Sequence, residues 1–520
     1  MNVGDWIRKR GQISCEETAV IFEDNRKEGK PTYTFSYKEL NERVNRLANA
    51  LLEKGICKGD RVATFCYNCN QMLETYFAVS KIGAIIVPLN FRLEAPETTF
   101  MLRDSGSKAL VFQDYFSEMI RSLQPSVHIP SKNFIVIGEK AAPWENYDEL
   151  LEKSSPEEPK AEDIEIDDPQ MIMYTSGTTG VPKGALMSHG KTLFNTLNAQ
   201  IYFDLTSKDI MLVVMPLFHS GGLNICAVPI LYQGGTAVVQ SAFDPHETLA
   251  LMEKHRVTAG LVVPTMLNFF LKKGGLDNFD LSSLRLLVIG GEPLPVALIE
   301  EYEKRNICIR QVFGQTETSI QLCQMPNEKD GKKIGSVGRS VFHADVRIVD
   351  KQGKDAPPGE VGELILKGPT QMLGYWNNPE ETAKSIRDGW LYTGDLAKMD
   401  EEGYVYIVDR ARDVIISGGE NIYPAEIERV YASNPKILEV AVIGVPDTKW
   451  GEVGKALIVL KEGEAMTEEE AIGFLKGKIA KYKIPKQVQF TDEFPKTASG
   501  KIKKAQLKKK YTLPSESDHV

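Results

Sequence analysis

The segment RVATFCYNCNQMLETYFAVSKIGAIIVPL, residues 61–89, decides the fold class. It contains two short apolar runs, RVATFC at 61–66 and AIIVPL at 84–89, which predict strands. Between them, residues 71–82 have the spacing of an amphipathic helix. A strand, a helix and a second strand in this order predict parallel strands that are covered by helices on both faces, which is an α/β architecture.

The same alternation continues on both sides of this segment. Upstream, Ser36 and Glu39 form a capping box, and apolar residues follow at helical spacing until Gly55 ends the run. Downstream, LRLLVIGG at 284–291 predicts another strand, with a helix over 296–304 behind it. The α/β region is therefore expected to extend far beyond residue 89.

The hydrophobic period changes to two after about residue 338, where DVRIVD, GELILKG and GYVYIVDR predict strands joined by tight turns. After residue 410 helices and strands alternate again, and the last predicted helix covers 468–481. We therefore predict a large N-terminal domain, 1–409, made of α/β subdomains and a small β-rich subdomain. A small, mobile α+β domain is expected over 410–520.

The composition excludes several classes of protein. The 520 residues include 62 Lys and Arg against 71 Asp and Glu, a net charge of −9, so no general positive field can collect nucleic acid. The first ten residues are not followed by an apolar stretch, so no secretory signal is expected. Cys66 and Cys69 form a C-x-x-C without the second pair that zinc requires. A cytoplasmic protein with reduced thiols is expected.

One long uncharged segment, Ile210–Tyr232, has the length of a membrane span. It contains no Asp, Glu, Lys or Arg, but Pro216, Pro229 and a pair of glycines interrupt it. Backbone exposed to lipid does not tolerate so many breaks. The segment is predicted to form a buried strand, a turn and a buried helix.

The segment Tyr174-Thr-Ser-Gly-Thr-Thr-Gly-Val-Pro-Lys-Gly184 carries the strongest local signal of chemistry. Its glycines let backbone N–H groups converge, its hydroxyls add donors, and Lys183 adds a positive charge. Such a loop suits a polyphosphate, although it lacks the spacing of a Walker A motif. A plain hairpin rich in glycine and threonine is the alternative.

Further candidates follow this loop. In VFGQTET, residues 312–318, Phe313 could lie flat on a nucleobase and Glu317 could help to hold Mg²⁺. Asp395 follows a glycine turn, and with Arg410 it suits a ribose. Each of these motifs taken alone is equally compatible with an ordinary turn or strand end.

The segment Lys496–Lys510 contains seven lysines and no acidic residue. Lys501 follows a Ser-Gly turn, so a single mobile lysine could enter a nucleotide site. A basic solvated tail is the usual alternative for such a run. The other lysines suit either the phosphates of a ligand or anionic lipid.

In this order and at these separations, the motifs resemble the adenylate-forming superfamily of acyl-CoA synthetases, aryl-CoA ligases, adenylation domains and beetle luciferases. The matching motifs extend from Tyr174 to Lys501. Within the superfamily, SGGENIYPAEIE at 417–428 and PDTKWGE at 446–452 look like the bacterial ligases of medium- and long-chain fatty acids. The resemblance implies the superfamily's fold, a fatty-acyl-CoA synthetase activity, and the use of ATP, Mg²⁺ and coenzyme A.

The resemblance also implies roles for individual residues. Those expected to bind ATP or AMP are Thr175, Ser176, Gly177, Thr178, Thr179, Gly180, Lys183, Gly290, Gly291, Glu292, Phe313, Gly314, Gln315, Thr316, Asp395, Arg410 and Lys501. The expected catalytic residues are Lys501, Thr175, Glu317 and His219, and Glu317 is also the expected metal ligand. Arg412 stands at the expected hinge, near 410–412, where Asp or Lys is common, and Phe313 stands where tyrosine is usual.

The acid is expected to lack an α-amine. Amino-acid-activating members place an Asp where PLFHSGG, residues 216–222, has His219. The expected acyl pocket consists of His219, Gly221, Gly222, Leu223, Gly314 and Ser319. Burial of CH₂ groups between apolar walls would reward a medium- or long-chain fatty acid. An aryl acid such as a cinnamate or benzoate is the alternative, because glycines equally make space for an aromatic ring.

Free CoA is the expected acceptor, because no phosphopantetheine-type domain follows the final lysine motif. The residues expected along CoA are Ser417, Gly418, Gly419 and Trp450. Loading of a carrier protein, luciferase-like oxygenation and a non-catalytic acyl-binding role remain alternatives. The expected partners are a small carboxylic acid and CoA, without nucleic acid, and both a peripheral membrane contact and a homodimer are left open.

Overall fold

The computed structural model describes residues 2–139, 142–175, 182–291, 294–323, 333, 335–410, 413–417, 420–447, 450–479, 481–497 and 500–512. Over these residues the chain forms two compact units. The first contains 1–346 and 366–391, and the second contains 347–365 and 392–520. Most of the expected β-rich subdomain thus groups with the C-terminal residues. The domain boundary at 409 and the hinge stay predictions, and Arg412 lies outside the described residues.

Residues 61–89 fold as the sequence predicts, into strand β3 (Arg61–Phe65), helix α3 (Asn70–Lys81) and strand β4 (Ile85–Pro88). The two strands are parallel neighbours in a sheet of order β19-β9-β8-β4-β3-β5-β6-β7. The other strands of this sheet are β5 (Ala109–Gln113), β6 (Phe134–Ile137), β7 (Glu145–Asn146), β8 (Pro169–Thr175), β9 (Lys183–Ser188) and β19 (Gly374–Tyr375).

A second sheet of the first unit has the order β16-β15-β14-β13-β12-β10-β11-β1-β2. From β11 to β14 its neighbouring strands are parallel, which confirms the predicted α/β class. Its strands are β1 (Thr18–Glu23), β2 (Thr32–Ser36), β10 (Ile210–Val213), β11 (Thr236–Gln240), β12 (Ala259–Val262), β13 (Leu286–Ile289), β14 (Ile309–Gln315), β15 (Ser319–Cys323) and β16 (Arg339–Ser340).

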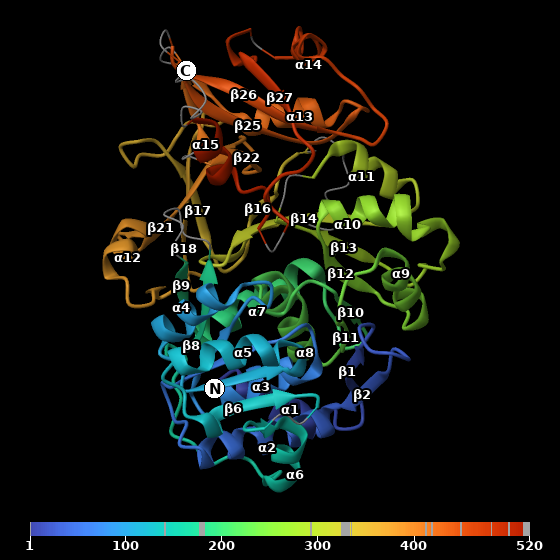
Figure 1. Cartoon of the computed structure of the whole chain (residues 1–520), viewed down its shortest axis with the longest axis vertical. Coiled ribbons are helices and arrows are strands. Elements are labelled where there is room, and N and C mark those ends of the chain that lie inside the picture. Colours follow the sequence, from blue (N-terminus) through green and yellow to red (C-terminus); the bar gives the residue numbers. More distant parts are fainter. Residues whose placement is uncertain are drawn as a thin grey trace. The chain divides into compact units, whose positions relative to one another are not determined.

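Alternating side chains of these strands build separate cores on the two faces of each sheet. Met211 and Val213 join a core with Val62 and Ile86 of the other sheet, whereas Leu212 packs on the opposite face. Five helices of the shared core are α1 (Gly4–Ile13), α2 (Tyr37–Glu53), α3, α7 (His189–Phe203) and α8 (Val228–Gln233). Helices α1, α2 and α3 lie side by side in this layer (Figure 1).

Helices also cover the outer faces of both sheets. Helices α9 (Pro245–Lys254), α10 (Pro264–Phe269) and α11 (Val296–Glu303) pack on the face that includes Leu212. Helices α4 (Ala95–Ser105) and α5 (Ser117–Leu123) pack on the outer face of the other sheet. The first unit is therefore layered as helices, sheet, helices, sheet and helices.

The uncharged segment Ile210–Tyr232 is buried within the first unit, as predicted. Strand β10 is followed by a turn, a π-helix over Gly221–Ala227 and helix α8. π-helical turns are rare and are frequently found at functional sites. Among the described residues, no helix combines the length and the apolar character needed to cross a bilayer.

The second unit is built largely on antiparallel pairs. One group of neighbouring strands is β17 (Asp345–Val349), β18 (Gly362–Lys367), β21 (Trp390–Met399) and β22 (Val405–Arg410). Another sheet contains β23 (Ile415–Ser417), β24 (Glu420–Ile422), β25 (Ile437–Asp447), β26 (Gly451–Leu460) and β27 (Gln487–Phe490). Helices α13 (Pro424–Ala432) and α15 (Lys504–Thr512) complete the unit together with α14 (Glu468–Leu475).

Helix α14 is shorter than the sequence predicts. Thr467 and Glu470 form a capping box at its start, but the helix ends at Leu475 rather than at Lys481. Lys476 is extended, and Gly477 adopts a left-handed conformation with φ +77°. Because a left-handed residue terminates a helix, the apolar spacing beyond Gly477 belongs to a turn.

Candidate active site

The predicted phosphate loop connects two antiparallel strands. Thr175 ends β8 and lies opposite Lys183, the first residue of β9. The structure thus holds the two ends of the loop side by side, and both residues are partly buried. The loop residues Ser176, Gly177, Thr178, Thr179 and Gly180 lie outside the described part of the chain.

Lys183 is engaged by a carboxylate. Its Nζ donates to Glu381 on helix α12 (Pro379–Ser385), and its side chain is 12% exposed. Strand β19 brings α12 to this place, because Tyr375 pairs with Ala185 of β9. The ammonium group of Lys183, with a smaller contribution from Lys384, lowers the pKa of Glu381 to about 2. The amine expected to meet phosphate is therefore charge-compensated in this structure.

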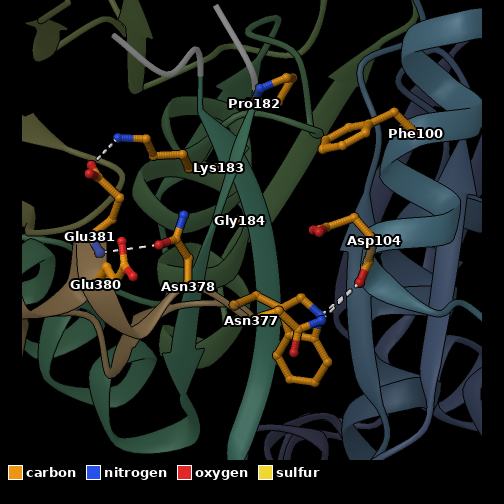
Figure 2. Close-up of a pocket in the computed structure, with 10 residues that line it drawn as sticks. Phe100, Asp104, Pro182, Lys183, Gly184, Asn377, Asn378, Glu380 and Glu381 are labelled. Atoms are coloured by element: carbon orange, nitrogen blue, oxygen red, sulfur yellow. Dashed lines mark hydrogen bonds and ion pairs between the residues drawn. The ribbon is translucent and has the colours of Figure 1, made fainter. Parts of the chain in front are cut away.

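A cavity of about 340 Å³ adjoins this ion pair. Figure 2 shows Lys183 and Phe100 on opposite sides of it, with the Lys183 side chain directed toward Glu381. Asp104, Glu380 and Glu381 all contribute to the lining. This excess of carboxylates makes the cavity a poor site for an anion while Glu381 is ionised.

Glu317 lies between β14 and β15, next to the start of the phosphate loop. Its Oε1 accepts hydrogen bonds from Thr175 Oγ1 at 3.3 Å and from the Tyr375 hydroxyl at 3.0 Å. Mg²⁺ that is bound through phosphates needs only one or two protein carboxylates. A single carboxylate beside the phosphate loop fits that requirement. Within the described ranges, no group of three His, Cys, Asp or Glu residues could hold a metal ion by itself.

Residues predicted to surround adenine follow two parallel strands. Gly290 and Gly291 come directly after β13, and Phe313 lies near the end of the neighbouring strand β14. The carboxyl ends of parallel strands are the usual ligand-binding edge of an open α/β sheet. A Cβ at Gly290 would stand 3.0 Å from Val312 Cγ2, so glycine permits the close approach of these strands. Glu292 is not among the described residues.

A tight turn joins β14 to β15 and carries several predicted site residues. A Cβ at Gly314 would stand only 1.9 Å from the backbone oxygen of Ser319, and Ser319 itself has φ +59°. Gln315 N donates to Thr318 Oγ1 at 2.9 Å within the turn. This close return of the chain places Gln315, Thr316 and Glu317 together at its tip.

Four of the six predicted acyl residues lie at or beside the π-helix, whereas Gly314 and Ser319 belong to the β14–β15 turn. His219 Nδ1 accepts the backbone N–H of Gly221 at 3.1 Å, and Leu223 is fully buried in the shared core. A Cβ at Gly221 would make ordinary contacts, 3.4 Å from His219 Nδ1 and 3.5 Å from Leu261. At Gly222, however, a Cβ would collide with the backbone oxygen of Met215 at 2.4 Å. Gly221 thus leaves side-chain space beside His219, whereas Gly222 is required by backbone packing.

The second unit brings the two predicted ribose ligands together. Asp395 of β21 and Arg410 of β22 are register partners, and Arg410 Nε lies 2.5 Å from Asp395 Oδ1. The Asp395 side chain is 3% exposed and that of Arg410 is 40% exposed. A carboxylate that is fixed by a more exposed guanidinium is suited to accept a hydrogen bond from a sugar hydroxyl, while the guanidinium can donate one.

The remaining predicted residues also lie in the second unit. Lys501 is exposed in a turn, where its backbone N–H donates to Thr497 Oγ1 at 3.1 Å and Gly500 has φ +90°. Ser417 ends β23, and Trp450, 42% exposed, directly precedes β26. Gly418 and Gly419, predicted to line the CoA arm, are outside the described residues.

Comparison with known proteins identifies the family. Residues 7–376 match the AMP-binding enzyme family, and residues 426–501 match the AMP-binding enzyme C-terminal domain. The chain belongs to the AMP-binding enzymes. The predicted resemblance to the adenylate-forming superfamily is thereby confirmed.

Several AMP-binding enzymes resemble the chain over almost its full length. A feruloyl-CoA synthase from an Amycolatopsis species is 40% identical, covering 98% of this chain and 99% of that protein. An indoleacetate–CoA ligase from Aromatoleum aromaticum is 37% identical, covering 97% of each. A long-chain-fatty-acid–CoA ligase from Mycobacterium tuberculosis is 35% identical, covering 98% and 99%.

Solved structures of AMP-binding enzymes have the same fold. The o-succinylbenzoate CoA synthetase from Bacillus subtilis, in complex with its acyl-adenylate intermediate, has a TM-score of 0.85 at 34% identity, covering 97% of this chain and 98% of that one. ATP-bound MatB from Rhodopseudomonas palustris has a TM-score of 0.88 at 31% identity, covering 98% and 99%. The chain is accordingly an ATP-dependent acyl- or aryl-CoA ligase that uses ATP, Mg²⁺ and CoA.

Three residues beside the candidate site of this AMP-binding enzyme match no motif of the sequence. Tyr375 and Glu381 reach Glu317 and Lys183, but no spacing rule connects them with the phosphate loop. Lys191 lies fully buried beneath the β14–β15 turn, and burial lowers its pKa to about 7 against the opposing attraction of Glu317. Lys191 stands in the first turn of α7, where a positive charge is unfavourable, but no helix was predicted over these residues.

Proposed function

We propose that this AMP-binding enzyme is an aryl-CoA ligase whose acid is planar and aromatic, of the cinnamate type. The observation that carries the proposal is the likeness to a feruloyl-CoA synthase and an indoleacetate–CoA ligase at 40% and 37% identity over nearly the whole chain. At Gly221 a Cβ would already be in van der Waals contact with His219 and Leu261, so the geometry there leaves space of about one methyl group and does not itself distinguish the two classes of acid. The sequence-based preference for a fatty acid becomes the second candidate.

The proposed reaction has two steps. A carboxylate oxygen of the acid first attacks the α-phosphate of ATP, forming the acyl–AMP bond as pyrophosphate leaves. The CoA thiol, losing its proton, then attacks the acyl carbonyl and AMP leaves. Negative charge develops on phosphate oxygens in the first step, so positioned donors and cations matter more than acid–base groups.

Residues of the first unit supply the donors for the phosphates in this proposal. Thr175 and Lys183 stand at the two ends of the phosphate loop, and both would contact the β- and γ-phosphates. Glu317 would hold Mg²⁺, which neutralises charge on the phosphates when bound. Thr316 would contact the α-phosphate, and Phe313 would stack on adenine next to Gly290 and Gly291.

Residues of the second unit also have proposed roles. Asp395 and Arg410, already paired with each other, would bind the ribose hydroxyls. Lys501 would stabilise charge on the acid and the α-phosphate during the first step only. Ser417 and Trp450 remain candidates for CoA contacts. The C-terminal domain, 410–520, would turn about the hinge at 410–412 between the two steps.

A fatty acid is the second candidate for the substrate. A long-chain-fatty-acid–CoA ligase is 35% identical over 98% of this chain. Leu223, a fully buried apolar residue, lies in the same predicted acyl segment as Gly221. A chain of CH₂ groups buried there would contribute about 0.8 kcal/mol each.

The decisive experiment compares kcat/KM for ferulate, 4-coumarate, benzoate, octanoate and palmitate with CoA as acceptor. We expect both cinnamates to exceed the two aliphatic acids by at least about tenfold, equivalent to about 1.4 kcal/mol in the transition state. Octanoate or palmitate above the cinnamates would replace the proposal with the fatty-acid candidate. Absence of acid-dependent pyrophosphate exchange into ATP with all five acids would contradict both.

A further inference from the structure

Lys191 is an unusual lysine. It occupies the first turn of α7, where Ser188 Oγ accepts its backbone N–H at 3.1 Å, and its relative exposure is 2%. The amino end of a helix carries positive partial charge, so a cation is electrostatically unfavourable there. A buried ammonium is costly as well unless it is well paired. Within the described chain, no carboxylate lies within ion-pair distance of it, and its acceptors are neutral oxygens.

Both acceptors of Lys191 belong to the β14–β15 turn. The Nζ atom donates to the backbone oxygen of Thr316 at 3.1 Å and also to Ser319 Oγ. These two residues flank Glu317. A single amine therefore connects the two ends of the short segment that carries the expected metal ligand.

The backbone of the β14–β15 turn is strained and closely packed, so side-chain hydrogen bonds help to maintain it. Ser319 is a non-glycine residue at φ +59°, a conformation that is uncommon outside glycine and costs free energy. The chain also returns so closely that Gly314 and the Ser319 backbone oxygen leave no room for a Cβ. External hydrogen bonds are required to maintain a backbone of this kind.

Helix α7 also holds Ile320, the residue after Ser319, through the side chain of Asn195. Asn195 lies one turn after Lys191 on the same face, and its Oδ1 accepts the backbone N–H of Ile320 at 3.2 Å. Its Nδ2 donates to the backbone oxygen of Asn224 in the π-helix at 2.7 Å. The two side chains form a continuous row of contacts from the metal-ligand turn to the acyl segment.

We propose that Lys191 is a positioning residue that holds the Thr316–Ser319 turn and thereby sets the places of Thr316 and Glu317 for Mg·ATP. The proposal rests on the adenylating function proposed above. Lys191 acts through the turn, because its hydrogen bonds go to Thr316 and Ser319. Its loss should therefore weaken the binding of Mg·ATP more than the binding of the acid.

A matched control exists in the same unit. Lys81 is also buried, with a side chain 3% exposed, but its Nζ donates to Asn41, Asn45 and the carboxylate of Glu158. Lys81 therefore has a carboxylate partner, whereas Lys191 has none among the residues that the structure describes. Lys81→Met removes a buried amine away from the turn and reports the general cost of such a change.

The test measures the dissociation constant of Mg·ATP by calorimetry for the full-length wild type, Lys191→Met and Lys81→Met. Lys191→Met should raise this constant by about tenfold, whereas Lys81→Met should leave it unchanged. The Mg²⁺ concentration for half-maximal pyrophosphate exchange should rise in Lys191→Met, with the KM of the acid unaffected. Thermal unfolding of both variants separates misfolding from a local effect.

A double-mutant cycle tests whether Lys191 and Ser319 act through the same hydrogen bond. Ser319→Ala removes one acceptor and should weaken Mg·ATP binding less than Lys191→Met does. The double variant should be no worse than Lys191→Met, because both changes interrupt the same connection. Additive effects would show that Ser319 and Lys191 act separately and would overturn the proposal.

Other outcomes have equally definite meanings. Unchanged Mg·ATP binding in a folded Lys191→Met variant overturns the proposal, as does a rise in the KM of the acid alone. If the wild type binds Mg·ATP but activates no acid, the proposed function fails while the binding comparison still decides the role of Lys191. A wild type that does not bind Mg·ATP overturns both.

Discussion

For Lys183, the sequence motif predicts a role, and the structure adds the partner of its side chain. Its position in the glycine- and threonine-rich segment predicts a cation for phosphate, and the structure places it at the end of the loop opposite Thr175. The same structure pairs it with Glu381, whose carboxylate stays ionised because its pKa is lowered to about 2. A phosphate must therefore compete with a resident carboxylate for this amine.

Removing that competition should improve ATP binding. We expect Glu381→Gln to lower the KM for ATP by about threefold, because a partly exposed ion pair contributes at most about 1 kcal/mol, or roughly fivefold. Glu380→Gln is the matched control, since Glu380 lines the same cavity and Glu381, not Glu380, accepts the hydrogen bond from Lys183. Steady-state kinetics in low salt measures both. A higher KM for ATP in Glu381→Gln would mean that the carboxylate helps Lys183 rather than competing with phosphate.

At the scale of an element, the π-helix Gly221–Ala227 separates two roles that the sequence could not distinguish. Gly221 and Gly222 are neighbours in the same motif, and the sequence predicts that both make room for the acid. The structure gives a Cβ at Gly221 ordinary contacts, but it places the Met215 backbone oxygen 2.4 Å from a Cβ at Gly222. Backbone proximity, which depends on the tertiary fold, decides which glycine is replaceable.

Two alanine variants should therefore behave differently. Gly222→Ala should reduce the free energy of unfolding by about 1–3 kcal/mol, since the backbone must shift to relieve the collision. Gly221→Ala should keep its stability, because alanine also favours helical backbone, and should lower kcat/KM for bulky acids selectively. Urea unfolding and the acid panel measure the two effects. Equal destabilisation by both variants would contradict this assignment.

At the scale of the whole molecule, the net charge of −9 conceals local compensation. The lysine-rich segment 496–510 looks like a free basic tip in the sequence. In the second unit, however, Lys496 pairs with Glu439, Lys504 with Glu428 and Lys508 with Glu452. At least these three of the seven lysines are thus paired within the unit. This reduces the charge available for the lipid contact that the sequence left open.

A buried histidine should make the stability of the first unit depend on pH. His189 is 1% exposed, and its Nδ1 accepts the backbone N–H of Val3, so it must be neutral when folded. Burial lowers its pKa from 6.5 to about 4. The unfolded state binds the proton more readily than the folded state. The contribution of neutral His189 to the free energy of unfolding is therefore complete above pH 6.5 and is lost as the pH falls toward 4.

This linkage can be measured by urea unfolding at pH 7 and pH 5. Between pH 7 and pH 5, the free energy of unfolding of the wild type should fall by about 2 kcal/mol more than that of His189→Asn. The reason is that each unit of difference between the folded and unfolded pKa corresponds to about 1.4 kcal/mol. His128 is exposed, and His128→Asn should keep the wild-type pH dependence. An unchanged pH dependence in His189→Asn would contradict the assignment.

Local patterns predicted much of the fold, because helix caps and apolar spacing act over a few residues. The capping box at Ser36, the strand–helix–strand unit at 61–89 and the helix predicted over 296–304 are all confirmed. The apolar spacing after Leu475 was misleading, because a left-handed glycine ends α14 there. Asp395 and Arg410 were predicted as one group and do lie side by side.

The sequence by itself determined the α/β class and the family, since motifs and short-range spacing carry this information. Only the tertiary structure decided the partners of residues at the candidate site. Glu381 reaches Lys183 across 198 positions, and Lys191 reaches Ser319 across 128. Such contacts depend on how strands and helices from distant segments pack together, and no local periodicity records that packing.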